Sequence, residues 1–316
     1  MRLAFMGTPA FSVPSLRALL ENPSHEVLFV VTQPDKPQGR GMHVQSPPVK
    51  DIASRHGLPV LQPETLKGNT TIRDTFALSG LDAVVVVAYG RMIPADWLAI
   101  PRFGFINVHA SLLPEFRGAA PINRAILAGK TETGVSIMRI EEAMDAGPVY
   151  LQASTPIGPD EDAVILSERL SELGAKKLTE VLPLIEEGAI VAVAQDHARA
   201  TYAPMLRKEE GEIDWHASGK DICTLVRGLV PWPCAYTHLD GKLLRILKAV
   251  FEPSETPEEP GTLVKEKCGV RISCGDGYVI PKVLQVEGRR AAACDAFACG
   301  LRCDRASLGQ SGRRTG

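Results

Sequence analysis

The sequence predicts an α/β fold with a Rossmann-like, mostly parallel sheet in an N-terminal domain and a small OB-like β-barrel in a C-terminal domain. In the first half, short apolar runs alternate with amphipathic helical patterns, which is typical of βαβ units. After residue 230, short β runs follow one another, separated by Asp-Gly and Gly-Asp-Gly turns, as in small barrels. The length of 316 residues, at about 150 residues per domain, agrees with two domains.

The first βαβ unit lies at the start of the chain. Residues 2–6 form an apolar strand, residues 13–20 place their apolar side chains on one helical face, and residues 27–31 form a second β run. A glycine turn joins the first strand to the helix. This order predicts parallel strands with a right-handed crossover.

Further strands and one long helix complete the N-terminal domain. Residues 82–87 are apolar throughout, as expected of a central parallel strand covered on both faces. Residues 105–109 form another strand, with its polar residues at the C-terminal end. Two more β runs follow at 134–140 and 149–152, and an amphipathic helix is expected over residues 162–187.

The domain boundaries follow from changes in composition. We assign residues 1–194 to the N-terminal domain, the polar residues 195–211 to a linker, and residues 212–303 to the C-terminal domain. Residues 304–316 are rich in Gly, Ser and Arg, which predicts a disordered tail. The C-terminal domain is expected to contain a helix at 217–227 and strands at 235–239, 243–250, 261–264, 270–273 and 278–286.

Composition excludes several classes of protein. With 45% apolar and 23% charged residues, the chain is neither disordered nor collagen-like. The longest apolar run, residues 83–88, is far shorter than the roughly 20 residues that cross a bilayer, so no membrane association is expected. We detect no export signal. None of the seven cysteines lies in a C-x-x-C pair, which predicts a cytoplasmic protein with reduced thiols and no bound metal.

Charge is distributed unevenly along the chain. From residue 261 onward there are ten Lys or Arg and five Asp or Glu, a net +5. Because the whole chain carries −2, the preceding residues carry −7. A basic segment on an acidic body is expected where only that segment faces a polyanion such as RNA. The alternative is a small β-rich domain that is basic without any such role.

Three polar residues could carry chemistry. Asn107 and His109 lie two apart on a strand, so both side chains point to one face, near the strand end where open parallel sheets bind ligands. An amide and an imidazole could polarise a carbonyl and handle a proton. Asp145 stands in a tight Met-Asp-Ala-Gly-Pro turn and could orient His109. The alternatives are a strand-end pair bound to loop backbone and an ordinary hairpin turn.

The combination of these motifs is more specific than its parts. F-x-N-V-H-x-S-L-L-P-x-x-R-G-x-x-P at residues 105–121, followed by M-D-x-G-P at 144–148, resembles the folate-dependent formyltransferases, most closely the branch that acts on methionyl-tRNA. The last fifty residues fit this pattern loosely, and their many cysteines are unusual. The resemblance also covers residues 6–9, 32–41, 88–94, 200–211, 213–215 and 227–233.

The resemblance implies transfer of a formyl group from 10-formyltetrahydrofolate to the α-amine of methionyl-initiator tRNA, in support of translation initiation. The amine would attack the formyl carbon directly, without a Ser or Cys nucleophile. Asn107 and His109 would stabilise the tetrahedral oxyanion, and Asp145 would orient His109 and help to move the proton.

The resemblance also implies where folate binds. The flat pterin would lie between two segments that offer backbone groups flanked by apolar side chains. Without the motif, these apolar side chains would be taken for core residues. The residues concerned are Arg91, Met92, Ile93, Ser111, Leu112, Leu113 and Pro114.

Transfer RNA is the implied partner, and we expect a monomer. In the family's pattern the long polar loop at residues 33–48, with Lys36 and Arg40, reaches the acceptor end of the tRNA. The barrel would track the tRNA backbone through basic side chains. These are Lys265, Lys267, Arg271, Lys282, Arg289 and Arg290.

Two other functions stay open. One is formyl transfer to a small amine, such as a sugar nucleotide; the basic loop and the second domain argue against it. The other is a non-catalytic RNA-binding protein on a Rossmann-like scaffold; binding alone would not require Asn107, His109 and Asp145 together.

Overall fold

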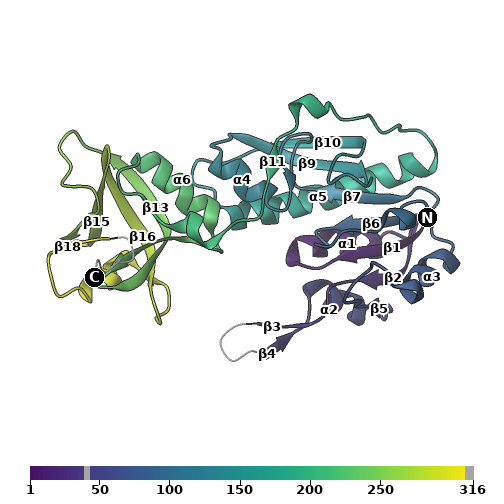
Figure 1. The fold of residues 1–316 in the computed structure, drawn as a ribbon, viewed down its shortest axis with the longest axis horizontal. Helices are drawn as coiled ribbons and strands as arrows, with labels where there is room; N and C mark the ends of the chain where they lie inside the picture. Colours follow the sequence, from purple (N-terminus) through teal and green to yellow (C-terminus); the bar gives the residue numbers. More distant parts are fainter. Residues whose placement is uncertain (39–42, 310–316) are drawn as a thin grey trace. The chain divides into compact units, whose positions relative to one another are not determined.

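The computed structural model describes residues 1–38 and 43–309 and divides into two compact units (Figure 1). The first unit comprises Met1–Ile122, Glu132–Pro156 and Leu166–Pro204. The second comprises Asn123–Thr131, Ile157–Ile165 and the described residues from Met205 onward. The expected linker, residues 195–211, is therefore divided between the two units instead of standing apart from them.

A seven-stranded sheet, in the order β10-β9-β7-β6-β1-β2-β5, forms the centre of the first unit. The five strands from β5 to β7 pair in parallel, whereas β9 and β10 are antiparallel, which confirms a mostly parallel sheet. The strands are β1 (Arg2–Gly7), β2 (Glu26–Val31), β5 (Val60–Leu61), β6 (Ala83–Val87), β7 (Phe105–His109), β9 (Glu132–Arg139) and β10 (Val149–Pro156).

Helices cover both faces of this sheet because its strands are apolar on both sides. Successive residues of a strand point to opposite faces. Leu3 and Phe5 pack in one core with α1, α2 and α5, while Ala4 and Met6 belong to a second core with Phe76 of α3. These helices are α1 (Val13–Glu21), α2 (Pro48–Arg55), α3 (Thr70–Leu78) and α5 (Ala163–Glu186), whereas the residues of α4 (Pro121–Leu127) are divided between the two units.

Several short elements were not anticipated. Helix α3 begins at a cap in which the Asn69 side chain accepts a hydrogen bond from the Ile72 N–H at 3.1 Å. Helices α2 and α3 contain a larger share of polar residues than α1, so their apolar pattern is weaker. The other short elements are η1 (Ala10–Ser12), β3 (Lys36–Gln38), β4 (His43–Gln45), η2 (Ala95–Trp97), β8 (Arg117–Gly118), η3 (His197–Arg199), β11 (Tyr202–Ala203) and η4 (Lys208–Gly211).

The second unit contains a curled antiparallel sheet in the order β12-β13-β16-β15-β14-β18, which confirms the predicted small β domain. Trp215 and two side chains of α6, Ile222 and Val226, are buried against its strands. The elements are α6 (Gly219–Leu229), β12 (Ala235–Leu239), β13 (Lys242–Pro253), β14 (Thr262–Glu266), β15 (Gly269–Cys274), β16 (Gly277–Val286), β17 (Ala292–Ala293), α7 (Cys294–Cys299) and β18 (Arg305–Ser307).

The prediction of a disordered tail over residues 304–316 is wrong for the first part of this range. β18 pairs with β14, and Gly309 forms an antiparallel bridge with His238 of β12, so this segment links the two ends of the sheet. Backbone pairing with the free edge of β14 orders these residues, and composition does not reveal such pairing. Residues 310–316 lie outside the described residues.

In the described part of the chain, no helix is both long and apolar enough to cross a membrane.

Candidate active site

His109 and Asp145 meet at the C-terminal end of β7. The His109 Nδ1 atom lies 3.7 Å from Asp145 Oδ2, and the side chains are 6% and 18% exposed. On the other side of the ring, Nε2 lies 3.0 Å from the Phe116 carbonyl oxygen. Because a carbonyl only accepts hydrogen bonds, Nε2 carries a proton in this arrangement. Nδ1 is then the nitrogen that faces the carboxylate.

Asn107 lies two residues before His109 on β7, and strand alternation places both side chains on the same face. The side chain is half-buried. Within residues 1–38 and 43–309, its amide makes no hydrogen bond, so both amide protons are available to a ligand. The backbone around it is held by β6 and β9, through the pairs Val86–Asn107 and Asn107–Met138.

The turn that carries Asp145 is tightly constrained. Asp145 has a positive φ of 48°, and the backbone N–H of Gly118 donates to its Oδ2 at 2.8 Å. A Cβ atom at Gly147 would lie 2.0 Å from the Arg139 carbonyl oxygen, so only glycine fits there. The Gly-Pro sequence after Asp145 thus reflects a real packing requirement.

A segment assigned to the linker contributes to the site, which sequence reasoning missed. The Gln195 amide donates to the carbonyl oxygens of Asp145 and Gly147, at 2.8 and 2.7 Å. The Thr201 hydroxyl accepts from the Phe116 N–H at 2.8 Å, and β11 pairs in parallel with β8. In the sequence, this contribution was indicated only by the family motif at residues 200–211, and that motif does not include Gln195.

The loop at residues 111–114, expected to bind folate, is anchored on β9 and β10. The Ser136 hydroxyl donates to the Ser111 carbonyl at 2.7 Å and accepts from the Leu113 N–H at 3.1 Å. Gln152 donates to the Leu113 carbonyl at 2.7 Å. Ser111 and Leu113 are buried, whereas Leu112 and Pro114 are half-buried. The loop therefore has a fixed backbone with apolar side chains beside it.

The three residues of the second segment expected to bind folate, residues 91–93, lie in three different environments. The Arg91 guanidinium donates to the backbone carbonyls of Pro63, at 2.9 Å, and Glu64. Met92 is 73% exposed, and Ile93 packs against the core that contains Phe76. Arg91 thus anchors neighbouring backbone, and Met92 is the apolar side chain that this segment leaves to solvent.

The expected tRNA-binding loop is described in part. Lys36 lies in β3 and its ammonium donates to the Gln33 side chain at 2.9 Å. Gln33 in turn donates to the Tyr89 carbonyl at 2.9 Å, at the end of β6. Burial raises the pKa of the Tyr89 phenol. Arg40 lies outside the described residues.

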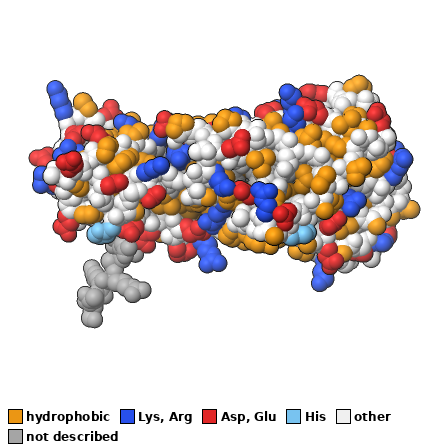
Figure 2. Space-filling model, turned by 90° about the horizontal axis from the view of Figure 1, so that it is seen from above, with side chains coloured by type: hydrophobic (Ala, Val, Ile, Leu, Met, Phe, Trp, Pro, Cys, Tyr) orange, Lys and Arg blue, Asp and Glu red, His pale blue; other side chains and the backbone are white. Residues whose placement is uncertain are grey.

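The basic residues of the second unit fall into two groups. Arg271 pairs with Glu258 at 3.5 Å and Glu266 at 3.4 Å, and its guanidinium lies over the Tyr278 ring. Lys265 donates to the Leu301 carbonyl at 3.3 Å. On the face drawn in Figure 2, basic and acidic side chains are interspersed. The exposed members of the set are Lys267, Lys282, Arg289 and Arg290.

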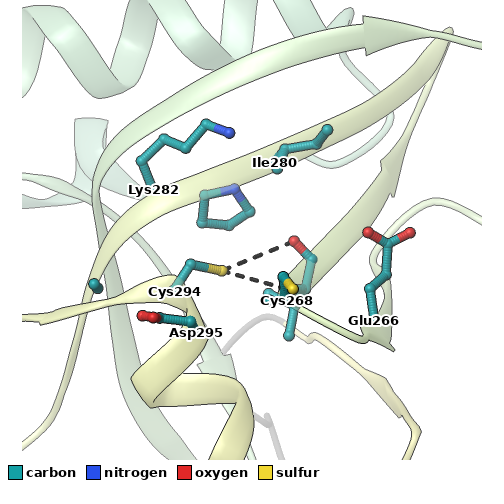
Figure 3. Close-up of a pocket in the computed structure, with 10 residues that line it drawn as sticks. Glu266, Cys268, Ile280, Lys282, Cys294 and Asp295 are labelled. Atoms are coloured by element: carbon teal, nitrogen blue, oxygen red, sulfur yellow. Dashed lines mark hydrogen bonds between the residues drawn. The ribbon is translucent and has the colours of Figure 1, made fainter.

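A separate pocket of about 300 Å³ lies within the second unit (Figure 3). Lys282 of β16, Glu266 at the end of β14 and Cys294 at the start of α7 contribute to its lining. The Val270 N–H donates to the Cys294 sulfur at 3.3 Å, and burial raises the pKa of this thiol. The mixed charge of this pocket favours no single class of ligand.

Among residues 1–38 and 43–309, no three His, Cys, Asp or Glu side chains are grouped so that they could hold a metal ion.

Comparison with known families agrees with the fold. Residues 1–182 match the family described as formyl transferase, and residues 205–302 match its C-terminal domain. A methionyl-tRNA formyltransferase of Geobacter sulfurreducens is 43% identical over 314 residues, which covers 99% of this chain and 98% of the relative. Another, from a Sulfurihydrogenibium species, is 46% identical over 287 residues, covering 90% and 92%.

Solved structures share the fold at low sequence identity. WlaRD, a sugar 3N-formyl transferase, is 15% identical with a TM-score of 0.66 and covers 92% of this chain and 99% of its own. HypX from Aquifex aeolicus, in complex with tetrahydrofolic acid, is 19% identical with a TM-score of 0.66; the match covers 95% of this chain and 47% of HypX. Such identities establish the architecture alone, and the family is established by the domain matches and the close relatives. The chain belongs to the formyl transferase family, in its methionyl-tRNA formyltransferase branch.

Proposed function

We propose that this chain transfers the formyl group of 10-formyltetrahydrofolate to the α-amine of methionine esterified to initiator tRNA. Family membership and the activity named for relatives that are 43% and 46% identical support the reaction. One geometric observation carries the chemistry. The Asn107 amide, which has no hydrogen-bond partner among the described residues, shares a strand face with His109, whose ring adjoins the Asp145 carboxylate.

The transfer needs no nucleophile from the protein. The lone pair of the amine attacks the formyl carbon, a C–N bond forms, and the carbonyl electrons move onto oxygen. The Asn107 amide and the His109 Nε2–H are the donors that stabilise this oxyanion, and Nε2–H exchanges the Phe116 carbonyl for the oxyanion as it forms. When the carbonyl re-forms, the bond from carbon to the folate nitrogen breaks. Asp145 orients His109 and helps to move the proton lost by the amine to that nitrogen.

The folate co-substrate binds along two segments of the first unit. The loop at residues 111–114 is held by Ser136 and Gln152, so its backbone has one fixed conformation beside which a pterin can bind. Leu112 and Pro114 are half-buried and Met92 is exposed, which gives a flat ring apolar surface to pack on. Arg91 contributes indirectly, because its guanidinium holds the backbone of residues 63–64.

The tRNA is held by electrostatic contacts on both units. Lys36 and Arg40 contact the acceptor end, and the exposed basic side chains of the barrel contact the phosphate backbone. Arg271 and Lys265 contribute less than the other basic residues because carboxylates and a backbone carbonyl already engage them.

The deciding experiment measures transfer of radiolabelled formyl from 10-formyltetrahydrofolate by the purified chain. Methionyl-initiator tRNA is the expected acceptor, and free amino acids and amino sugars are the comparison. Equal transfer to a small amine would contradict the acceptor, and tRNA binding without any transfer would contradict the reaction.

A further inference from the structure

The side chain of Gln195 joins the Asp145 turn to strand β8. Its Nε2 donates to the carbonyl oxygens of Asp145 and Gly147, at 2.8 and 2.7 Å. Its Oε1 accepts from Nε and Nη2 of Arg117, at 3.1 and 2.7 Å. An amide has two donor protons and an oxygen with two lone pairs, so these four bonds use its full capacity. Gln195 is 8% exposed, and water competes little for any of these bonds.

Arg117 is an unusual partner for this amide. Its side chain is 4% exposed, yet within residues 1–38 and 43–309 no carboxylate lies at ion-pair distance from it. Its neighbours are neutral acceptors: Gln195 and the Nδ1 atom of His197, 3.1 Å from Nη2. Burying a cation without a counter-charge is costly, so this arrangement contributes little to stability by itself.

The turn held by Gln195 needs such support. Asp145 has a φ of 48°, in the left-handed region that residues other than glycine seldom occupy. Such a conformation persists where surrounding contacts impose it. Gln195 binds the backbone of the turn, and the N–H of Gly118, next to Arg117, binds the Asp145 carboxylate at 2.8 Å. Two residues of β8 thus restrain Asp145. Arg117 acts on the backbone of the turn through Gln195, and Gly118 binds the carboxylate directly.

We infer that Gln195, oriented by Arg117, is a positioning residue for formyl transfer: it fixes the backbone of the Asp145 turn so that the carboxylate faces His109. This inference rests on the proposed role of Asp145. Only an amide can make this connection, because it must accept from a guanidinium at one end and donate to two carbonyls at the other. A carboxylate would keep the bonds to Arg117, but its second oxygen would face both carbonyl oxygens without a proton to donate and would be repelled by them.

The test is Gln195→Glu, measured in the full chain with methionyl-tRNA and 10-formyltetrahydrofolate. We expect kcat to fall at least about tenfold, because small displacements of catalytic groups cost large factors in rate. KM for each substrate should stay within about twofold, since Gln195 touches neither binding segment. Asn69→Asp is the matched control: it makes the same amide-to-carboxylate change at the N-cap of α3 and should leave kcat unchanged. An unchanged kcat in Gln195→Glu, or a change confined to KM, would overturn the inference.

A double-mutant cycle separates this inference from the proposed function. If Gln195 acts through Asp145, Gln195→Glu should lower kcat little further in an Asp145→Asn background. Full additivity would show that Gln195 acts elsewhere. If Asp145→Asn alone keeps normal turnover, the proposed role of Asp145 fails; if it loses turnover while Gln195→Glu does not, only the positioning role fails.

Gln195→Met covers the case in which the first variant does not fold. It keeps the length of the side chain, removes both sets of hydrogen bonds and introduces no charge. We expect a folded protein by circular dichroism and thermal melting, with the same selective loss of kcat. If both variants are unfolded, Gln195 is a residue of the folding core and the positioning role is refuted.

Discussion

Asn107 and His109 show how a single strand can present two donors to one reacting centre. Alternation along β7 puts their side chains on one face, and pairing with β6 and β9 holds the backbone on both sides. Neither side chain contributes to the apolar cores. Their replacement should therefore affect chemistry more than folding.

Single alanine substitutions at Asn107, His109 and Asp145 test the proposed chemistry at the residue scale. Each variant should fold normally and lose about a hundredfold or more in kcat, because an oriented donor or its orienting carboxylate is removed from a partly dehydrated site. Steady-state formylation, with circular dichroism as the folding control, makes the measurement. Turnover near that of the unmodified chain in any one variant would remove that residue from the mechanism.

The cysteines give a second prediction at this scale. Burial raises the pKa of the Cys223 thiol to about 11, while Cys268, Cys299 and Cys303 are exposed. Since the thiolate is the nucleophile, Cys223 should react slowly with iodoacetamide at pH 8, and its rate should rise about tenfold per pH unit up to about pH 11. Mass spectrometry of labelled peptides gives each rate. Rapid labelling of Cys223 at pH 8, in protein whose fold is intact, would contradict this prediction.

At the scale of elements, the loop at 111–114 depends on side chains from two strands that follow it in the chain. The Ser136 hydroxyl is fully buried and bridges the Ser111 carbonyl and the Leu113 N–H. Gln152 adds a bond to Leu113 from β10. The geometry of this loop is therefore set by its contacts with β9 and β10, as well as by its proline.

Ser136→Ala should loosen this loop. Two buried backbone groups would lose their partner, which should cost about 1–3 kcal/mol in the free energy of unfolding and raise KM for folate several-fold. Urea unfolding and folate titration of the rate provide the measurements. Ser154→Ala, at an exposed position on β10, is the control and should change neither quantity. An unaltered folate KM in Ser136→Ala would argue against folate binding along this loop.

At the scale of the whole molecule, net charge alone is a poor guide to the partner. The chain carries −2 overall, yet its last residues are basic, and the structure divides those basic residues into engaged and exposed groups. The exposed group is the better candidate for phosphate contacts, because an engaged cation must first break its own ion pairs.

Replacing Arg289 and Arg290 together by Ala tests this division. Binding of methionyl-tRNA should weaken, and the slope of log K against log salt should decrease by about one for each phosphate that these side chains neutralise. KM for folate should not change. Lys177→Ala, on α5 and paired with Glu180, is the control and should keep the full slope. A double variant with an unaltered salt slope would show that these arginines do not bind tRNA phosphates.

Several elements of the fold were predictable because their patterns are local. Strand β7 has the predicted bounds, and α5 follows the periodicity of its apolar residues to within one residue at each end. Helices α2 and α3 were missed because polar residues make up a larger share of them than of α1, which weakens the apolar pattern. β18 was missed because its strand exists only through pairing with β14, and a polar, Arg-rich composition resembles that of a disordered tail.

Residue type and spacing were enough to predict the α/β class, the second β domain, the family resemblance and the positions of Asn107, His109 and Asp145, because each of these is read from patterns within short segments of the chain. The folded chain was needed to show that Asp145 reaches His109, that the Phe116 carbonyl engages the other ring nitrogen, and that Gln195 and Arg117 restrain the Asp145 turn. Most of these interactions join residues far apart in the chain. Several of their partners are backbone carbonyls, which every residue possesses, so no pattern of side chains could predict them.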